Sequence, residues 1–286
     1  MITRNILIFS IILLKFHNYS GCESASKSKL SSPPSYDLNS PQKIELTQAL
    51  NEISGIAYYP KDTSVFAIVD GDGLFFKIYL NKNKQVKVWR FDKKHDFEDL
   101  VLHDSTFYIL ISNGDIEKVR FFSDSLSIAK SVFPGGDKKV NEFETLYYDE
   151  HHKKLIMLCK NCAENKQDKT EVTAYGISTD SLTYEPDFFK IEVEPIAKKL
   201  GIPKLNLKPS AAAYNPISKE LYILASVNKL LVILDQKGTF KEAYPLSPEI
   251  FKQPEGIAFT PGGDMLISNE AGKSGLANIL IYKYKK

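Results

Sequence analysis

One pattern recurs five times along this chain, and a repeat of this length constrains the fold more than any other feature of the sequence. Its copies are ISGIAYYP, FEDLVLHD, FETLYYDE, PSAAAYNP and PEGIAFTP, which begin at Ile53, Phe97, Phe143, Pro209 and Pro254. Their second residues lie 44, 46, 66 and 45 residues apart. The one long interval holds two insertions, CKNCAENKQDKTE after Leu158 and the helix-like EPIAKKLGIPK from Glu194. The repeat therefore keeps a period of about 45 residues.

Each copy continues with short apolar segments that have the composition of β-strands. In the first copy these are SVFAIVD and LFFKIYL, and turns rich in Gly, Asn, Asp and Pro separate such segments along the chain. Four strands in a period of this length match a propeller blade, whereas a helical solenoid would show a 3.6-residue period. The sequence therefore predicts an all-β, five-bladed propeller over residues 43–286. A six-bladed propeller and a β-sandwich are the alternatives.

The fifth copy ends at Lys286 after three strands, one fewer than the other copies. The segment KIELTQA, from Lys43, precedes the first copy and belongs to no other blade. We expect it to supply the outer strand of the last blade, because closing the ring in this way removes open strand edges that would otherwise aggregate.

The first residues of the chain have the pattern of an export signal. Arg4 precedes an apolar run at residues 6–14, and Ser20, Gly21 and Cys22 follow. The run is too short to span a bilayer, which takes roughly 20 apolar residues. The ending resembles a bacterial lipoprotein signal, so residues 1–21 are a predicted signal peptide and Cys22 the predicted acylated residue. The alternative is an ordinary cleaved signal in which Cys22 has no special role.

Residues 22–42 are rich in Ser, Pro and Lys and show no strand or helix period, which is typical of a flexible tether. We therefore expect an exported protein, held in the cell envelope by a lipid anchor and exposed to the periplasm or the cell surface.

Without residues 1–21 the chain has 35 basic and 35 acidic side chains. This balance argues against nucleic acid as a partner, because such binding depends on phosphate neutralisation.

Equivalent residues at the strand starts predict a site at the centre of the ring. The first strand of each blade runs beside the propeller axis, so the second residues of the five copies should converge at one end of the channel: Ser54, Glu98, Glu144, Ser210 and Glu255. Converging carboxylates repel one another unless a cation compensates. Calcium takes six to eight oxygen ligands, and the absence of His and Cys from this ring disfavours zinc. The alternative is that the glutamates pair with lysines in a wet channel.

A second set of mostly oxygen-bearing side chains stands at the ends of the next strands. It comprises Asp70, Ser112, Lys160, Ser226, Asn269 and Glu270. Asn269 joins the predicted metal ligands, and the others are predicted to line the channel mouth. Cys159 and Cys162 form C-K-N-C in an exported chain, which favours a structural disulfide, with two free thiols as the alternative.

The five copies, with PEGIAF followed by ISNE as the most specific motif, resemble the SdiA-regulated family of exported bacterial β-propellers over about residues 45–286. The resemblance implies five blades and a calcium site, and it implies no activity.

Two functions stay open. The first is a calcium-bearing binding module for a small ligand or a partner protein. The alternative is a calcium-dependent hydrolase of the lactonase or esterase type, with Asp70 or Glu270 as the base.

Overall fold

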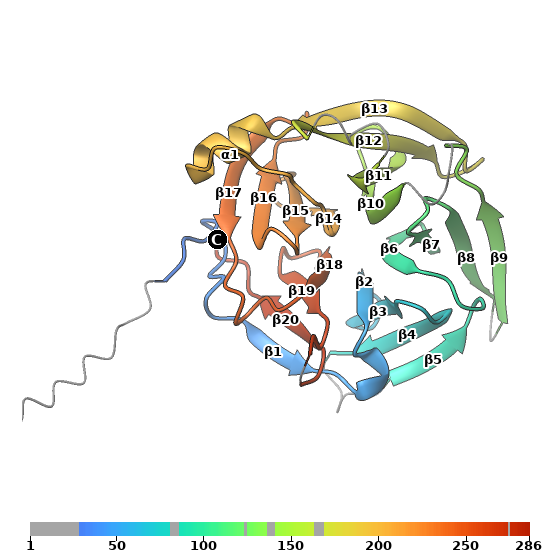
Figure 1. Cartoon of the computed structure of the whole chain (residues 1–286). Coiled ribbons are helices and arrows are strands. Elements are labelled where there is room, and N and C mark those ends of the chain that lie inside the picture. The colour runs from blue at the N-terminus through green and yellow to red at the C-terminus, as the bar shows by residue number, and fades with distance from the viewer. Residues whose placement is uncertain (1–28, 81–85, 123–124, 136–140, 163–168, 274) are drawn as a thin grey trace, which may run out of the picture.

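The strands of the chain form five separate four-stranded antiparallel sheets, set as blades around a common axis (Figure 1). This computed structural model describes residues 29–80, 86–122, 125–135, 141–162, 169–273 and 275–286. The predicted all-β propeller of five blades is confirmed, and the six-bladed and sandwich alternatives are wrong.

Each of the first four blades begins with an inner strand beside the axis and continues outward in chain order. The first blade contains β2 (Ile53–Tyr59), β3 (Ser64–Val69), β4 (Leu74–Tyr79) and β5 (Val86–Arg90). The second contains β6 (Phe97–His103), β7 (Thr106–Ile111), β8 (Ile116–Phe122) and β9 (Ser125–Ser131). The third contains β10 (Glu142–Asp149), β11 (Lys154–Asn161), β12 (Glu171–Ser178) and β13 (Tyr184–Glu192). The fourth contains β14 (Ala211–Tyr214), β15 (Leu221–Ala225), β16 (Leu230–Leu234) and β17 (Phe240–Pro245).

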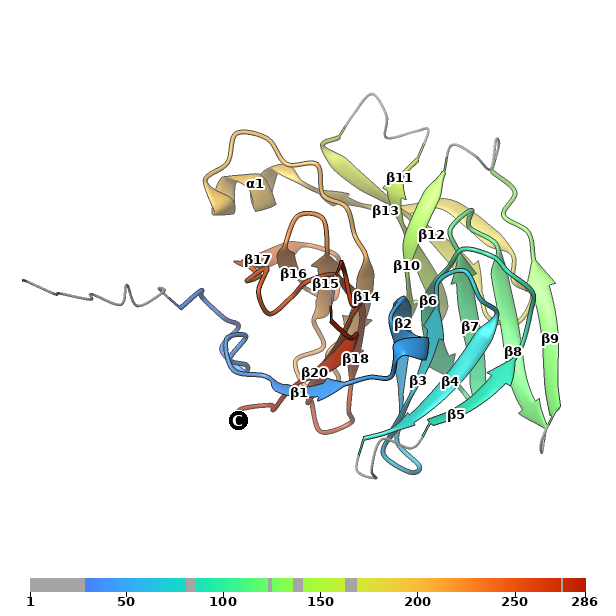
Figure 2. The same cartoon turned by 60° about the horizontal axis from the view of Figure 1, so that its bottom comes forward.

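The fifth blade combines the two ends of the propeller. It contains β18 (Pro254–Phe259), β19 (Met265–Asn269), β20 (Asn278–Tyr282) and, as its outer strand, β1 (Gln42–Glu45). β1 lies beside β20 (Figure 2). The two strands pair antiparallel, with Ile44 opposite Ile279. The predicted closure by the segment from Lys43 is therefore confirmed.

The hydrophobic core lies between neighbouring blades. β3 and β7 are buried along their whole length, because each packs between the sheets on either side. Between the first two blades, the ring centroid of Phe107 lies 4.7 Å from that of Phe66 and 4.8 Å from that of Phe75. Such aromatic pairs stabilise beyond the area they bury. The blades therefore depend on one another for their stability.

The insertion before the fourth blade contains α1 (Glu194–Leu200), as its sequence predicts. Pro195 occupies the first turn, where its missing N–H costs no helical hydrogen bond. Gly201 ends the helix in the left-handed region, with φ of 68°. The helix packs against β17 at the outside of the ring (Figure 1).

Residues 29–41 differ from the flexible tether that their composition predicts. Tyr36 and Leu38 are buried in the core between the fourth and fifth blades. The Tyr36 hydroxyl donates to the carbonyl of Gly263 at 2.6 Å and accepts from Nδ2 of Asn215 at 2.7 Å. The prediction failed because two apolar side chains, in a stretch dominated by Ser and Pro, are enough to dock it.

The predicted signal peptide and Cys22 lie outside the described residues. Within the described part of the chain, no helix has the length and apolar character needed to cross a bilayer.

Replacing Tyr36 by Phe tests whether this segment is part of the folded domain. The change removes the hydroxyl and leaves buried polar groups of Gly263 and Asn215 without their partner, which costs about 1–3 kcal/mol. Urea unfolding should show a lower midpoint with an unchanged slope. Tyr58→Phe, at a half-buried tyrosine of the channel, is the matched control. Equal midpoints for Tyr36→Phe and the wild type would show that the hydrogen bonds of the Tyr36 hydroxyl contribute nothing to stability.

Candidate functional site

Four of the five inner strands carry an irregularity at the predicted ring position. The pairing register shifts between Ile53 and Ile56 in β2, between Phe97 and Asp99 in β6, between Phe143 and Thr145 in β10 and between Pro254 and Gly256 in β18. Each shift marks a β-bulge, in which an extra residue bends the strand and re-aims a side chain. Ser54, Glu98, Glu144 and Glu255 stand within these bulges.

The bulged residues line one cavity at this end of the inner strands. Its volume is about 450 Å³, and it brings together Ser54, Asp70, Asp96, Glu98, Glu142, Glu144, Lys160, Ser226, Val227, Lys229, Gln253, Glu255 and Glu270. Four of the predicted metal ligands and four of the predicted mouth residues are therefore in one place. Seven of the lining side chains are carboxylates and two are lysines, so the cavity is acidic.

The carboxyls deepest in this cavity hold their protons more tightly than usual. Burial, followed by the neighbouring Asp96, raises the pKa of Glu98 to about 9, although Lys160 acts in the opposite direction. Burial raises the pKa of Glu255 to about 7 against the hydrogen bond from Ser226. The cations present therefore do not compensate the carboxylates that converge here.

Two further carboxyls at the mouth show the same effect. Burial, followed by the charge of Glu255, raises the pKa of Glu270 to about 7, while Nε2 of Gln253 donates to its Oε2 at 2.7 Å. Burial and the adjacent Asp96 raise the pKa of Asp70 to about 6. Both pKa values lie close to neutral pH, so these carboxyls change between their protonated and ionised forms under physiological conditions.

Lys160 compensates one side of the cavity. Its ammonium forms ion pairs with Glu144 and, at 2.7 Å, with Oε1 of Glu142. Glu142 also accepts a hydrogen bond from the Asn161 amide at 2.5 Å. The second lysine, Lys229, donates to the carbonyl of Lys252 at 2.6 Å. The two carboxylates of the third blade are therefore paired with a lysine, whereas the second and fifth blades contribute carboxyls with raised pKa values.

Three predicted site residues lie outside the cavity lining. The Ser210 hydroxyl donates to the carbonyl of Pro254 at 2.8 Å and accepts from the Ser226 N–H, so it joins the fourth blade to the fifth. Asn269 is fully buried, and its Nδ2 lies 3.2 Å from Oδ1 of Asn278. Ser112 donates to Oδ2 of Asp96 at 2.6 Å and so supports a lining residue from behind.

Several lining residues were missed by the sequence analysis. Asp96 and Gln253 precede the repeat positions, and Glu142 stands two residues before Glu144. Asp96 and Gln253 lie in the turns that enter the inner strands, and Glu142 is the first residue of β10. The variable length of these turns hides the equivalence of the three positions. The sequence offered one signal for these lining residues, because an acidic residue stands directly before each of the FED and FET motifs.

The aspartate of FED has a structural place beside the site. Asp99 is fully buried and accepts hydrogen bonds at 2.8 Å from its own blade, at the Leu100 N–H, and from the next blade, at the Leu146 N–H. The inner strands approach so closely here that a Cβ on Gly55 would overlap the backbone of Leu100. Asp99 and Gly55 therefore fix the spacing of the first three blades.

Cys159 and Cys162 are joined in a disulfide at the end of β11, beside Lys160. The link closes a short loop next to the residue that pairs with Glu144 and Glu142. It therefore stands where it can restrain the wall of the cavity.

A second cavity occupies the opposite end of the channel. It has a volume of about 630 Å³ and is lined by later residues of the same inner strands, among them the aromatic side chains of Tyr58, Tyr148, Tyr214 and Phe259. His103 stacks on Tyr148 with ring centroids 3.5 Å apart. The two ends of the channel thus differ in chemistry, one acidic and the other aromatic.

Comparison with known proteins shows a likeness in fold. No protein-family model matches the chain, and no curated protein matches its sequence. Among solved structures, the glutaminyl cyclase of Myxococcus xanthus is similar at a TM-score of 0.56 and 14% identity, over 86% of this chain and 96% of that one. The PQQ-bound aldose sugar dehydrogenase of Streptomyces coelicolor is similar at a TM-score of 0.51 and 10% identity, over 89% and 100%.

A luciferin-regenerating enzyme is similar at a TM-score of 0.50 and 11% identity, over 86% of this chain and 96% of the enzyme. The structural neighbours are β-propeller proteins. At such low identities the likeness shows the fold alone, so the class of this protein is a five-bladed β-propeller with an acidic cavity at one end of its channel.

The raised pKa values predict how stability depends on pH in the absence of divalent cations. Glu98, Glu255 and Glu270 bind protons more tightly in the folded chain than in the unfolded one, where the pKa is near 4.5. Their stabilising effect is complete below pH 4.5 and is lost as pH rises through 7 to 9. Each group lowers the free energy of unfolding by at most about 1.4 kcal/mol per pH unit within its window.

The measurement is the melting temperature in EDTA between pH 5 and pH 9. It should fall with rising pH in the wild type and fall less in Glu98→Gln, which stays neutral. Glu150→Gln, at an exposed turn, is the control and should follow the wild type. A Glu98→Gln profile parallel to the wild type would contradict the raised pKa of Glu98.

Proposed function

We propose that this protein is a calcium-bearing binding module of the cell envelope, belonging to the SdiA-regulated group of exported propellers. The observation that carries the proposal is the convergence of Glu98, Glu255 and Glu270 on one cavity. Their pKa values stay above the ordinary value of a glutamate, although two lysines line the same cavity. A divalent cation would compensate these charges. Calcium suits the site because the available donors are oxygen atoms from several elements.

The proposed ligands are the oxygen donors that the cavity brings together on the first, second and fifth blades. They are Ser54, Asp70, Glu98, Glu255 and Glu270. Glu144 has a different part in this arrangement, because it holds Lys160 at the edge of the site. Bound calcium would supply a positive centre, and the chain's own groups would then orient a ligand around it.

The cavity volume of about 450 Å³ is within the range of small-molecule sites. Lys160 and Lys229 both line it. A small ligand that carries a carboxylate or several hydroxyl groups would meet the cation and these lysines together. We therefore propose a small polar or anionic molecule as the ligand.

We further propose that the domain is held close to a membrane by acylated Cys22. The support is the Ser20-Gly21-Cys22 ending after a short apolar run. Leu30 is already tied to Asn39 by two hydrogen bonds. Because an extended chain spans at most about 3.6 Å per residue, the few residues between Cys22 and this point would keep the propeller near the surface.

Calcium binding is tested by thermal unfolding of the purified chain in EDTA and in excess calcium. A ligand present at 100 times its Kd stabilises the folded state by about 2.7 kcal/mol. The melting temperature should therefore rise by several degrees in calcium, and magnesium should have a smaller effect. Glu255→Gln should weaken the response, whereas Glu150→Gln should retain it. A wild type with no bound metal and no response to calcium would end the proposal.

One observation supports a second candidate, a calcium-dependent hydrolase. Asp70 and Glu270 have pKa values of about 6 and 7, which is the range in which a carboxylate serves as a general base near neutral pH. A panel of lactones and esters separates the two functions. Turnover that requires calcium and is lost in Glu270→Gln even at saturating calcium would establish the hydrolase. Calcium binding without turnover would leave the binding module.

A further inference from the structure

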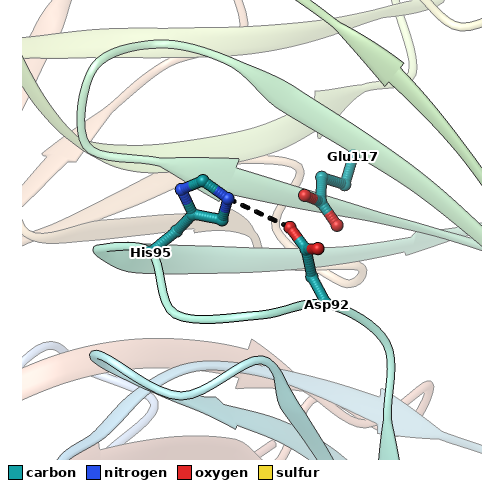
Figure 3. Close-up of side chains that lie close together, drawn as sticks. All are labelled: Asp92, His95 and Glu117. Carbon is teal, nitrogen blue, oxygen red and sulfur yellow. Dashed lines mark ion pairs between the residues drawn. The ribbon is translucent and has the colours of Figure 1, made fainter.

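A second group of metal-binding side chains lies away from the channel, between the first two blades. Asp92 follows β5 of the first blade, His95 stands in the loop that leads to β6, and Glu117 lies on β8 of the second blade. One ligand atom from each of the three lies within 4.8 Å of the others (Figure 3). Nε2 of His95 is 3.1 Å from Oδ2 of Asp92.

Glu117 is the unusual member of this group. Its side chain is 1% exposed, and the close-up shows its carboxyl directed at Asp92 (Figure 3). Oε1 lies 2.7 Å from Nζ of Lys130, and within the described part of the chain neither Oε1 nor Oε2 makes a hydrogen bond of regular geometry. A buried carboxylate oxygen without a partner costs free energy. Burial and the adjacent Asp92 raise the pKa of Glu117 to about 7, although Lys130 acts in the opposite direction.

Among the described residues, Lys130 is the only one whose ammonium pairs with both carboxylates. Its Nζ is 2.5 Å from Oδ2 of Asp92 and 2.7 Å from Oε1 of Glu117. Lys130 belongs to β9, the outer strand of its blade, and its side chain is 48% exposed. A long side chain at an exposed edge can turn into solvent when another cation takes its place.

We propose that Asp92, His95 and Glu117 form a binding site for a transition-metal ion of the zinc type, with Lys130 as the built-in cation that occupies it otherwise. A histidine nitrogen with two carboxylate oxygens suits zinc or cobalt, whereas calcium prefers oxygen alone. Tetrahedral zinc holds its ligand atoms about 3.3 Å apart, close to the separation of His95 and Asp92. Three protein ligands leave the fourth position for water.

The ion would connect two blades. Asp92 and His95 come from the segment that joins the first blade to the second, and Glu117 comes from the third strand of the second blade. A divalent ion would bring a second positive charge to the carboxylates and would give Oε2 of Glu117 a ligand. None of these residues lines the channel cavity, although Asp96, next to His95 in the sequence, does. The site is therefore separate from the proposed calcium site.

The experiment uses Co²⁺ as a spectroscopic probe on the purified full chain. The wild type should develop the visible absorption of tetrahedral cobalt, and Zn²⁺ should displace it. His95→Ala should abolish the absorption, whereas His151→Ala, at an exposed histidine, should keep it. Glu255→Gln in the channel should also keep it, which separates this site from the calcium proposal. Absorption of equal strength in His95→Ala would overturn the inference.

Lys130→Met provides the second test. The change leaves Glu117 and Asp92 without their ammonium, so the melting temperature in EDTA should fall. If Lys130 competes with a metal, this variant should bind Co²⁺ at least tenfold more tightly than the wild type, and Zn²⁺ should restore its melting temperature. A destabilised Lys130→Met protein that Zn²⁺ does not restore would show that the four residues form a structural ion-pair cluster only.

Discussion

The pairing of β1 with β20 is the constraint on which the rest of this structure depends. Each hydrophobic core lies between two blades, so every blade depends on both of its neighbours to bury its apolar side chains. The pairing of Ile44 with Ile279 completes the fifth blade and fixes it beside the first. Hydrogen bonds at the inner strands then continue the ring, as when the Ser268 hydroxyl donates to the carbonyl of Ser54. The acidic cavity exists because this closure forces the strand starts together.

The β-bulges convert a repeated scaffold into a site. In a regular strand, side chains alternate between the two faces, and both faces of an inner strand meet neighbouring blades. An extra residue at Glu98, Glu144 and Glu255 breaks this alternation and frees the side chain to enter the channel. The fourth blade shows regular pairing from Ala211 onward, and there Ser210 bonds to the next blade instead of lining the cavity. The same repeat position thus serves either packing or chemistry.

The fold was predictable from sequence because five aligned copies share one turn-and-strand pattern, and the missing strand could be assigned by elimination. Glu98 and Glu255 were found for the same reason. Lys160 was placed at the mouth, yet its pairing with Glu144 needed the three-dimensional distance. The docking of Tyr36 depends on a pocket formed by strands more than 170 residues away. Asp92, His95 and Glu117 belong to no shared repeat position, so only packing of two blades reveals them.

The distribution of charge links the two clusters. The chain without residues 1–21 carries equal numbers of acidic and basic groups, so an excess of negative charge is local to these two clusters. In each cluster one lysine is paired with two carboxylates: Lys160 with Glu142 and Glu144, and Lys130 with Asp92 and Glu117. Further carboxyls of raised pKa remain beside the first pair, and an unpartnered oxygen remains beside the second. In each cluster the lysine compensates part of the carboxylate charge when no metal is bound. Because it carries a single positive charge, a divalent cation would compensate the carboxylates more fully.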